Sequence, residues 1–176
     1  MKYNTLFLLT FGLKVLFCVR FDNSILMRFK IAYGSGGGNT ELVCQFIAKC
    51  LQEAGHQADL LRFKLIQPLD LLSDVDCVIL ASPTYGHGLL EQYTNRFMAK
   101  AEQENFDFKQ VPCAVVGLGD MMYDSDYFIE AAKILKEFVI QHNGKMTEHP
   151  LMIAKSPIPH LDTSVRKWVE RVIQAI

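Results

Sequence analysis

The stretch Tyr33-Gly34-Ser35-Gly36-Gly37-Gly38-Asn39-Thr40-Glu41 carries most of the information about the fold of this 176-residue chain. It follows a short apolar run, Phe29–Tyr33, and leads into an amphipathic pattern, Thr40–Ala54. A glycine-rich turn between a strand and a helix exposes backbone N–H groups beside the positive end of the helix dipole, where proteins bind phosphate. Taken alone, the run indicates either a phosphate site or a flexible turn that binds nothing. Side-chain donors for a phosphate are present on Ser35, Asn39 and Thr40.

Two well-known phosphate-binding loops do not match these residues. A nucleoside triphosphate loop has a lysine after its last glycine, and here that position is Asn39. The dinucleotide pattern needs a third glycine, and that position is again Asn39. The turn therefore has to be interpreted together with the rest of the chain.

The composition indicates one domain in a reducing compartment. A net charge of −1 argues against a nucleic-acid partner. The cysteines are odd in number and form no C-x-x-C pair, which is typical of a cytoplasmic protein without disulfides or a zinc site. The histidines also lack metal-ligand spacing, so we expect no metal. The cysteines are Cys18, Cys44, Cys50, Cys77 and Cys113.

The first 26 residues differ from the remainder of the chain. The segment Thr5–Val19 is apolar apart from Lys14 and has no small-x-small cleavage site after it. It is also shorter than the about 20 apolar residues of a membrane span, so we expect no membrane anchor of that kind. We predict that residues 1–26 are an extension outside the fold, either upstream of a true start at Met27 or a targeting segment. The folded domain is expected to cover residues 27–176.

From Met27 onward, apolar strand patterns alternate with helical patterns. Such alternation is typical of an α/β fold, a three-layer α-β-α sandwich around a five-stranded, parallel, doubly wound sheet. The strands are predicted at Phe29–Tyr33, Gln57–Arg62, Cys77–Ala81, Cys113–Val116 and Leu151–Ala154. The helices are predicted at Thr40–Ala54, Glu91–Gln103, Tyr127–His142 and Leu161–Ile176.

Three loops follow the carboxyl ends of these strands. They are Ser35–Thr40, Pro83–Gly88 and Leu118–Tyr123. Ligands of doubly wound sheets bind outside the carboxyl ends of the strands, where the strand order reverses. We therefore expect the three loops to form one site.

Together the three loops resemble those of flavodoxins, over essentially the whole of residues 27–176. The family's phosphate loop, S/T-x-T-G-N-T, corresponds to Ser35-Gly36-Gly37-Gly38-Asn39-Thr40. Its second loop, an aromatic residue before a glycine, corresponds to Thr84-Tyr85-Gly86. Its third loop, G-x-G-D-x-x-Y, corresponds to Gly117-Leu118-Gly119-Asp120-Met121-Met122-Tyr123. The stretch from Gly144 to Leu161 is too short for the insertion of long-chain members, so the resemblance is to the short-chain group.

The resemblance implies strand order 2-1-3-4-5, non-covalent FMN, and a low-potential electron carrier that uses the semiquinone and hydroquinone forms. Tyr85 and Tyr123 would enclose the isoalloxazine, and the peptide after Gly86 would change orientation on reduction, for which glycine suits because of its freedom in φ. The implied FMN-binding residues are Ser35, Gly36, Gly37, Gly38, Asn39, Thr40, Pro83, Thr84, Tyr85, Gly86, His87, Leu118, Gly119, Asp120 and Tyr123.

Two departures from the family pattern affect this expectation. Gly36 and Gly37 lack the hydroxyl groups of a threonine-rich loop, so we expect weaker FMN binding. His87 stands beside Gly86, where a cation would stabilise the reduced flavin.

The resemblance also implies partners, namely redox proteins that dock at the flavin edge of a monomer. Acidic residues that could concentrate charge there are Glu91, Glu102, Glu104, Asp107, Asp120, Asp124 and Asp126. No nucleophile–base pair stands out, so an electron carrier is expected rather than an enzyme. The alternatives are a small FMN-dependent quinone or NAD(P)H reductase, or an accessory module that kept the fold and lost FMN. A receiver domain lacks support because the acidic cluster for Mg²⁺ is missing.

Overall fold

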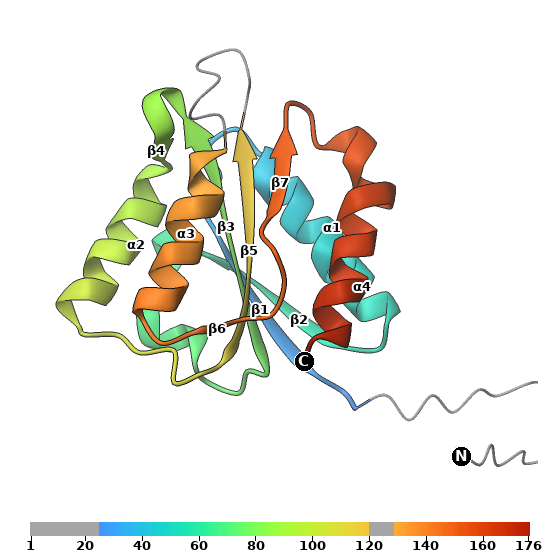
Figure 1. Ribbon diagram of the computed structural model, residues 1–176, viewed down its shortest axis with the longest axis horizontal. Coiled ribbons are helices and arrows are strands. Elements are labelled where there is room, and N and C mark those ends of the chain that lie inside the picture. The colour runs from blue at the N-terminus through green and yellow to red at the C-terminus, as the bar shows by residue number, and fades with distance from the viewer. Residues whose placement is uncertain (1–24, 120–128) are drawn as a thin grey trace, which may run out of the picture.

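The computed structural model describes residues 25–119 and 129–176, and its centre is a parallel sheet (Figure 1). The strands follow the order β2-β1-β3-β5-β6, which confirms the predicted doubly wound α/β fold. The long strands of the described part are β1 (Arg28–Tyr33), β2 (Gln57–Arg62), β3 (Cys77–Tyr85) and β5 (Pro112–Gly119).

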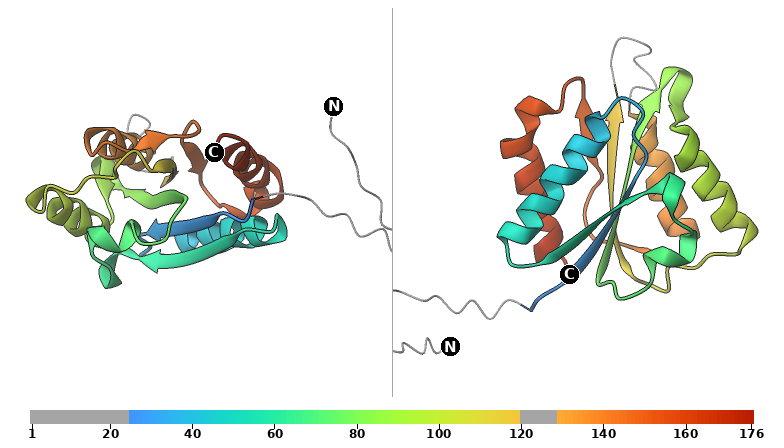
Figure 2. Two further views of the ribbon diagram at one scale, coloured as in Figure 1. Left: turned by 90° about the horizontal axis from the view of Figure 1, so that it is seen from below. Right: turned by 180° about the vertical axis from the view of Figure 1, so that it is seen from behind.

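The two central strands, β3 and β5, are buried on both faces. Residues 77–82 of β3 and 113–118 of β5 are all buried, as their unbroken apolar runs predicted. Both strands extend further toward their carboxyl ends than predicted, to Tyr85 and Gly119. By contrast β2, the outermost strand in Figure 2, is largely exposed or half-buried, as its polar ends predicted.

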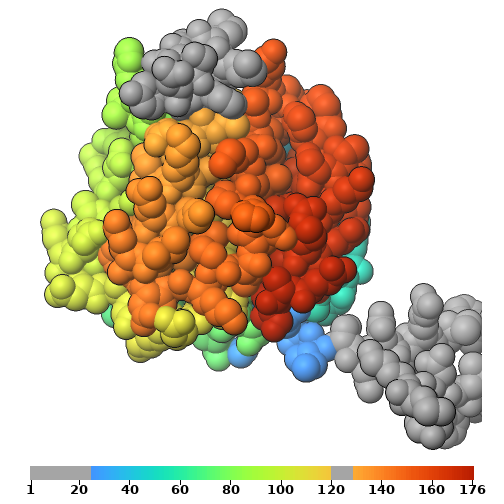
Figure 3. Space-filling model, viewed as in Figure 1, coloured from blue at the N-terminus to red at the C-terminus, as the bar shows by residue number. Residues whose placement is uncertain are grey.

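The last strand of the sheet is divided into two pieces. Both β6 (Lys145–Met146) and β7 (Leu151–Ala154) pair in parallel with β5, whereas the sequence predicted only the second. The indole Nε1 of Trp168 donates a hydrogen bond of 2.9 Å to the carbonyl oxygen of His149, between the two pieces. In Figure 3 the segment from β6 to β7 lies between the orange helix α3 and the red helix α4.

Two helices cover each face of the sheet (Figure 1). One face is covered by α1 (Asn39–Glu53) and α4 (Arg166–Gln174), and the other by α2 (Gln92–Gln103) and α3 (Glu130–Gln141). The final helix was predicted to begin at Leu161, but Leu161–Val165 forms a π-helical turn before α4. Within the described ranges, no helix has both the length and the apolar character needed to cross a membrane.

The strand register brings the predicted loops to one edge. Tyr33 at the end of β1 is the Cα partner of Ala81, and Pro83 is the Cα partner of Leu118. A short antiparallel strand, β4 (Leu89–Leu90), then returns beside the end of β3. The turns after β1, β3 and β5 therefore leave the sheet from neighbouring positions at its carboxyl edge.

Candidate functional site

The glycine-rich turn after β1 is held in place by hydrogen bonds within the protein. The backbone N–H of Gly34 donates to the carbonyl oxygen of Ala81 on β3, at 3.0 Å. Gly38 is the N-cap residue of α1 and has φ of 88°, a left-handed conformation that glycine adopts without strain. The Ser35 hydroxyl oxygen accepts from the N–H groups of Gly38 at 3.2 Å and Glu41 at 3.3 Å. The Ser35 side chain thus caps the first turn of α1.

Five backbone N–H groups of this turn have no acceptor among the described residues. They belong to Ser35, Gly36, Gly37, Asn39 and Thr40. Residues 36–39 are exposed, and Thr40 is buried. Because the N–H groups lie at the positive end of α1, the turn has the donors and the dipole that an anion requires.

The second predicted loop forms a tight turn between β3 and β4. Thr84 and Tyr85 pair with Leu90 and Leu89 in antiparallel register. The Thr84 hydroxyl oxygen accepts from the N–H of Ala131 at 3.0 Å, which ties the loop to α3.

Two residues of this turn have a left-handed conformation. They are His87, with φ of 59°, and Gly88, with φ of 76°, whereas Gly86 is not in that region. The chain reverses at these two residues to form β4.

The first and second loops touch each other at Tyr85 and Gly36. A Cβ placed on Gly36 would lie 2.3 Å from the hydroxyl oxygen of Tyr85. Tyr85 is 43% exposed, and its hydroxyl makes no hydrogen bond within the described residues. The aromatic side chain therefore reaches across the edge to the glycine-rich turn.

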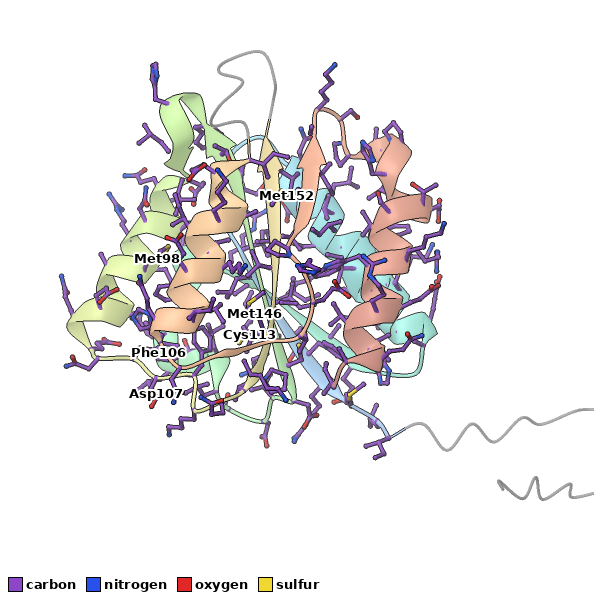
Figure 4. The ribbon with its side chains drawn as sticks, viewed as in Figure 1. Met98, Phe106, Asp107, Cys113, Met146 and Met152 are labelled. Atoms are coloured by element: carbon purple, nitrogen blue, oxygen red, sulfur yellow. The ribbon has the colours of Figure 1, made fainter. Side chains whose placement is uncertain are left out.

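The structure corrects the expectation for four of the acidic residues predicted at this edge, and the other three, Asp120, Asp124 and Asp126, lie outside the described residues. Glu91 is only 6% exposed, and its carboxylate accepts from the N–H groups of Tyr93 at 2.8 Å and Thr94 at 3.0 Å. It is thus the N-cap of α2, not a surface charge. Glu102, Glu104 and Asp107 lie near the end of α2, toward the opposite edge, as the labelled Asp107 shows in Figure 4.

An ion-pair cluster lies directly beside the glycine-rich turn. One terminal nitrogen of Arg62, at the end of β2, donates to both carboxylate oxygens of Glu41 at 2.6 Å. The Tyr33 hydroxyl also donates to Glu41, at 3.1 Å. The hydrogen bond from Arg62 holds the pKa of Glu41 below its usual value, while burial raises the pKa of Tyr33. The sequence did not single out this cluster.

Leu118 and Gly119, predicted to open the third loop, are the last two residues of β5. The carbonyl oxygen of Gly119 accepts from the N–H of Lys155 at 2.8 Å, after β7. Just before the loop, Gly117 packs against α3, where an added Cβ would lie 2.7 Å from the backbone nitrogen of Ala132. Asp120 and Tyr123, also predicted to bind FMN, lie outside the described residues.

The four thiols that the structure describes do not contribute to this edge. Cys44, Cys50, Cys77 and Cys113 are free and buried. Burial raises the pKa of the Cys113 thiol to about 12, so it stays protonated at neutral pH. The described residues also contain no group of three or more histidine, cysteine, aspartate or glutamate side chains that could hold a metal ion.

Comparison with known proteins gives consistent matches over the folded part of the chain. A family model described as Flavodoxin matches residues 31–168. The chain is 30% identical over 133 residues to the probable flavodoxin 2 of Bacillus subtilis (strain 168), covering 75% of this chain and 85% of that protein. It is 25% identical over 146 residues to the flavodoxin of Nitratidesulfovibrio vulgaris (Miyazaki F), covering 83% of this chain and 97% of that one.

The similarity extends to solved structures. The crystal structure of oxidised flavodoxin 2 from Bacillus cereus has a TM-score of 0.77 and 26% identity, covering 85% of this chain and 99% of that chain. Oxidised flavodoxin 1 from the same species has a TM-score of 0.73 at 19% identity, covering 85% of this chain and 99% of that chain, and supports the fold.

Proposed function

Since this chain belongs to the flavodoxin family, we propose that it binds FMN without a covalent bond and carries electrons one at a time between redox proteins. The observation that carries the proposal is the set of five backbone N–H groups, in the turn after β1, that have no acceptor among the described residues. These groups suit the phosphate of FMN, because they are fixed donors at the start of a helix. When bound, FMN supplies the one-electron chemistry.

The protein's own residues orient the phosphate end of the cofactor. Ser35 keeps the turn folded through its hydrogen bonds to Gly38 and Glu41, so it acts on the shape of the turn. Gly36, Gly37, Gly38, Asn39 and Thr40 form the cradle.

The flavin ring would lie between the second and third loops. Tyr85 and Leu89 offer exposed apolar surface there, with 43% and 61% of each residue accessible. Burial of a planar ring against such side chains excludes water from it. The proposed ring contacts are Pro83, Thr84, Tyr85, Gly86, His87, Leu118, Gly119, Asp120 and Tyr123.

We propose that the chain is a monomer and that its redox partner proteins dock at the edge of the flavin ring. Among the described residues, Glu91 is buried and Glu102, Glu104 and Asp107 lie toward the other edge, so this part of the chain offers a partner apolar and local polar contacts more than acidic ones. The described cysteines are free thiols, which supports a reducing compartment, and we propose the cytoplasm.

The direct test is a titration of the purified apoprotein with FMN and with riboflavin, which lacks the phosphate. Quenching of flavin fluorescence measures both dissociation constants. We expect FMN to bind about a hundredfold more tightly or better, because two or more N–H donors bond to a charged acceptor. Inorganic phosphate should weaken FMN binding and leave riboflavin binding unchanged. Equal affinities for the two flavins, or binding of neither, would contradict the proposal.

The ion pair beside the turn gives a second expected result. Arg62→Gln leaves Glu41 without its cation, next to a loop that has to hold a dianion. FMN affinity should fall roughly fivefold at low salt, since the loss is electrostatic and partly screened by solvent. Riboflavin affinity should stay the same, and the double variant Arg62→Gln/Glu41→Gln should recover FMN binding.

A matched control separates this effect from a general loss of positive charge. Arg166→Gln removes the same charge from an ion pair with Glu53 at the far end of α1, 2.9 Å apart. Its FMN affinity should equal that of the parent. A similar loss in both arginine variants would show that Arg62 has no special place beside the phosphate.

A further inference from the structure

The contact between Gly36 and Tyr85 suggests more than a close approach of two loops. A Cβ on Gly36 would lie 2.3 Å from the hydroxyl oxygen of Tyr85 and 3.5 Å from the ring carbon that carries it. At Gly37, the next residue, an added Cβ would meet nothing within 4 Å. The tyrosine hydroxyl thus takes the space that a side chain at position 36 would need.

The position of Tyr85 follows from the backbone around it. Its pairing with Leu89 fixes the end of β3, and the Thr84 hydroxyl is bonded to the N–H of Ala131 on α3. The backbone that carries the Tyr85 ring is therefore fixed both by the pairing with β4 and by the hydrogen bond to α3. Its hydroxyl has no partner within the described residues, so its proton is available to a ligand.

This hydroxyl lies beside Gly36, whose N–H has no acceptor among the described residues. The N–H of Gly37, the next residue of the glycine-rich turn, has none there either. A phenol hydroxyl at the rim of such a group of donors adds a further donor for the same anion.

We propose that Gly36 and Tyr85 act as a pair, in which the Tyr85 hydroxyl replaces a loop side chain and donates a hydrogen bond to the FMN phosphate. This inference rests on the proposed function and assigns Tyr85 a role at the phosphate end as well as beside the ring. It also explains why glycine stands at position 36, because any larger residue would displace the Tyr85 phenol. A hydroxyl added at position 36 should therefore remove one donor as it supplies another, whereas a hydroxyl at position 37 displaces nothing.

The first experiment removes only the hydroxyl. Tyr85→Phe keeps the aromatic ring, so riboflavin affinity should stay within about twofold of the parent, while the dissociation constant for FMN should rise about tenfold. The control is Tyr93→Phe, a tyrosine on α2 that is 39% exposed. That variant should bind both flavins as the parent does. Circular dichroism checks that each variant is folded.

The second experiment tests the pairing of the two positions. Gly36→Ser should weaken FMN binding in the parent but strengthen it in the Tyr85→Phe background, where the phenol oxygen is absent. Gly37→Ser should change FMN affinity by the same factor in both backgrounds. We therefore expect the effect of the serine on FMN affinity to change sign between the two backgrounds at position 36 and to stay the same at position 37.

Other results would contradict either the pairing of Gly36 with Tyr85 alone or the proposed function as well. If the parent prefers FMN over riboflavin but Tyr85→Phe binds FMN equally well, the pairing is wrong and the proposed function stands. The same conclusion follows if Gly36→Ser changes FMN affinity by the same factor in the parent and in the Tyr85→Phe background. If the parent binds neither flavin, both the proposed function and this inference fail.

Discussion

Gly117→Ala is expected to lower the free energy of unfolding by about 2–3 kcal/mol. The added Cβ would lie 2.7 Å from the backbone nitrogen and 2.9 Å from the Cα of Ala132, which belongs to α3. Since backbone atoms cannot rotate away as a side chain can, α3 has to move from β5. The midpoint of thermal unfolding should fall by about 5–10 °C, measured by circular dichroism on the apoprotein.

Gly37→Ala is the matched control for this substitution. It adds the same methyl group to a glycine, but with nothing within 4 Å of it. Its stability should equal that of the parent or rise slightly, because alanine restricts the unfolded chain. If both variants lose the same stability, the close packing of β5 on α3 is not the cause.

Trp168→Ala is expected to cost about 3–5 kcal/mol of stability. Trp168 is only 1% exposed and belongs to the core between the sheet and the α1–α4 face. Its indole also bonds to the His149 carbonyl oxygen between β6 and β7. Urea unfolding followed by far-ultraviolet circular dichroism measures the change, since the chain has no other tryptophan to report by fluorescence.

Trp168→Phe separates the packing of the ring from the hydrogen bond. Phenylalanine keeps most of the buried apolar area and loses the indole donor. Because His149 is exposed, water can bond to its carbonyl oxygen, so this variant should lose less than half of what the alanine variant loses. Equal losses would place the whole effect in the hydrogen bond.

The parts of the fold that sequence patterns predicted are those with a strong local signal. The unbroken apolar runs of β3 and β5 made their burial evident. By contrast β6 is two residues long, too short for a periodic pattern. The π-helical turn before α4 was missed because a helical pattern does not distinguish its hydrogen bonding.

At the site, the loops were predictable but their contacts were not. The pairing of Arg62 with Glu41 depends on the register of β2 against β1, which no local pattern specifies. Glu91 was interpreted as a surface charge because acidic residues usually are, yet its position as a cap buries it. The approach of Tyr85 to Gly36 depends on the turn through His87 and on a side-chain rotamer. Contacts of this kind are set by tertiary packing, which a single sequence does not display.

The hydrogen bonds of Ser35 have a consequence for how a ligand would act on the whole domain. The turn is bonded to β3 through Gly34 and closed by the Ser35 hydroxyl, so it is part of the folded state and is lost with it. A ligand held there binds the native chain and not the unfolded one. At a free concentration a hundred times its dissociation constant, such a ligand raises the free energy of unfolding by about 2.7 kcal/mol. The melting temperature should therefore climb with the logarithm of ligand concentration, which makes thermal unfolding an independent measure of affinity.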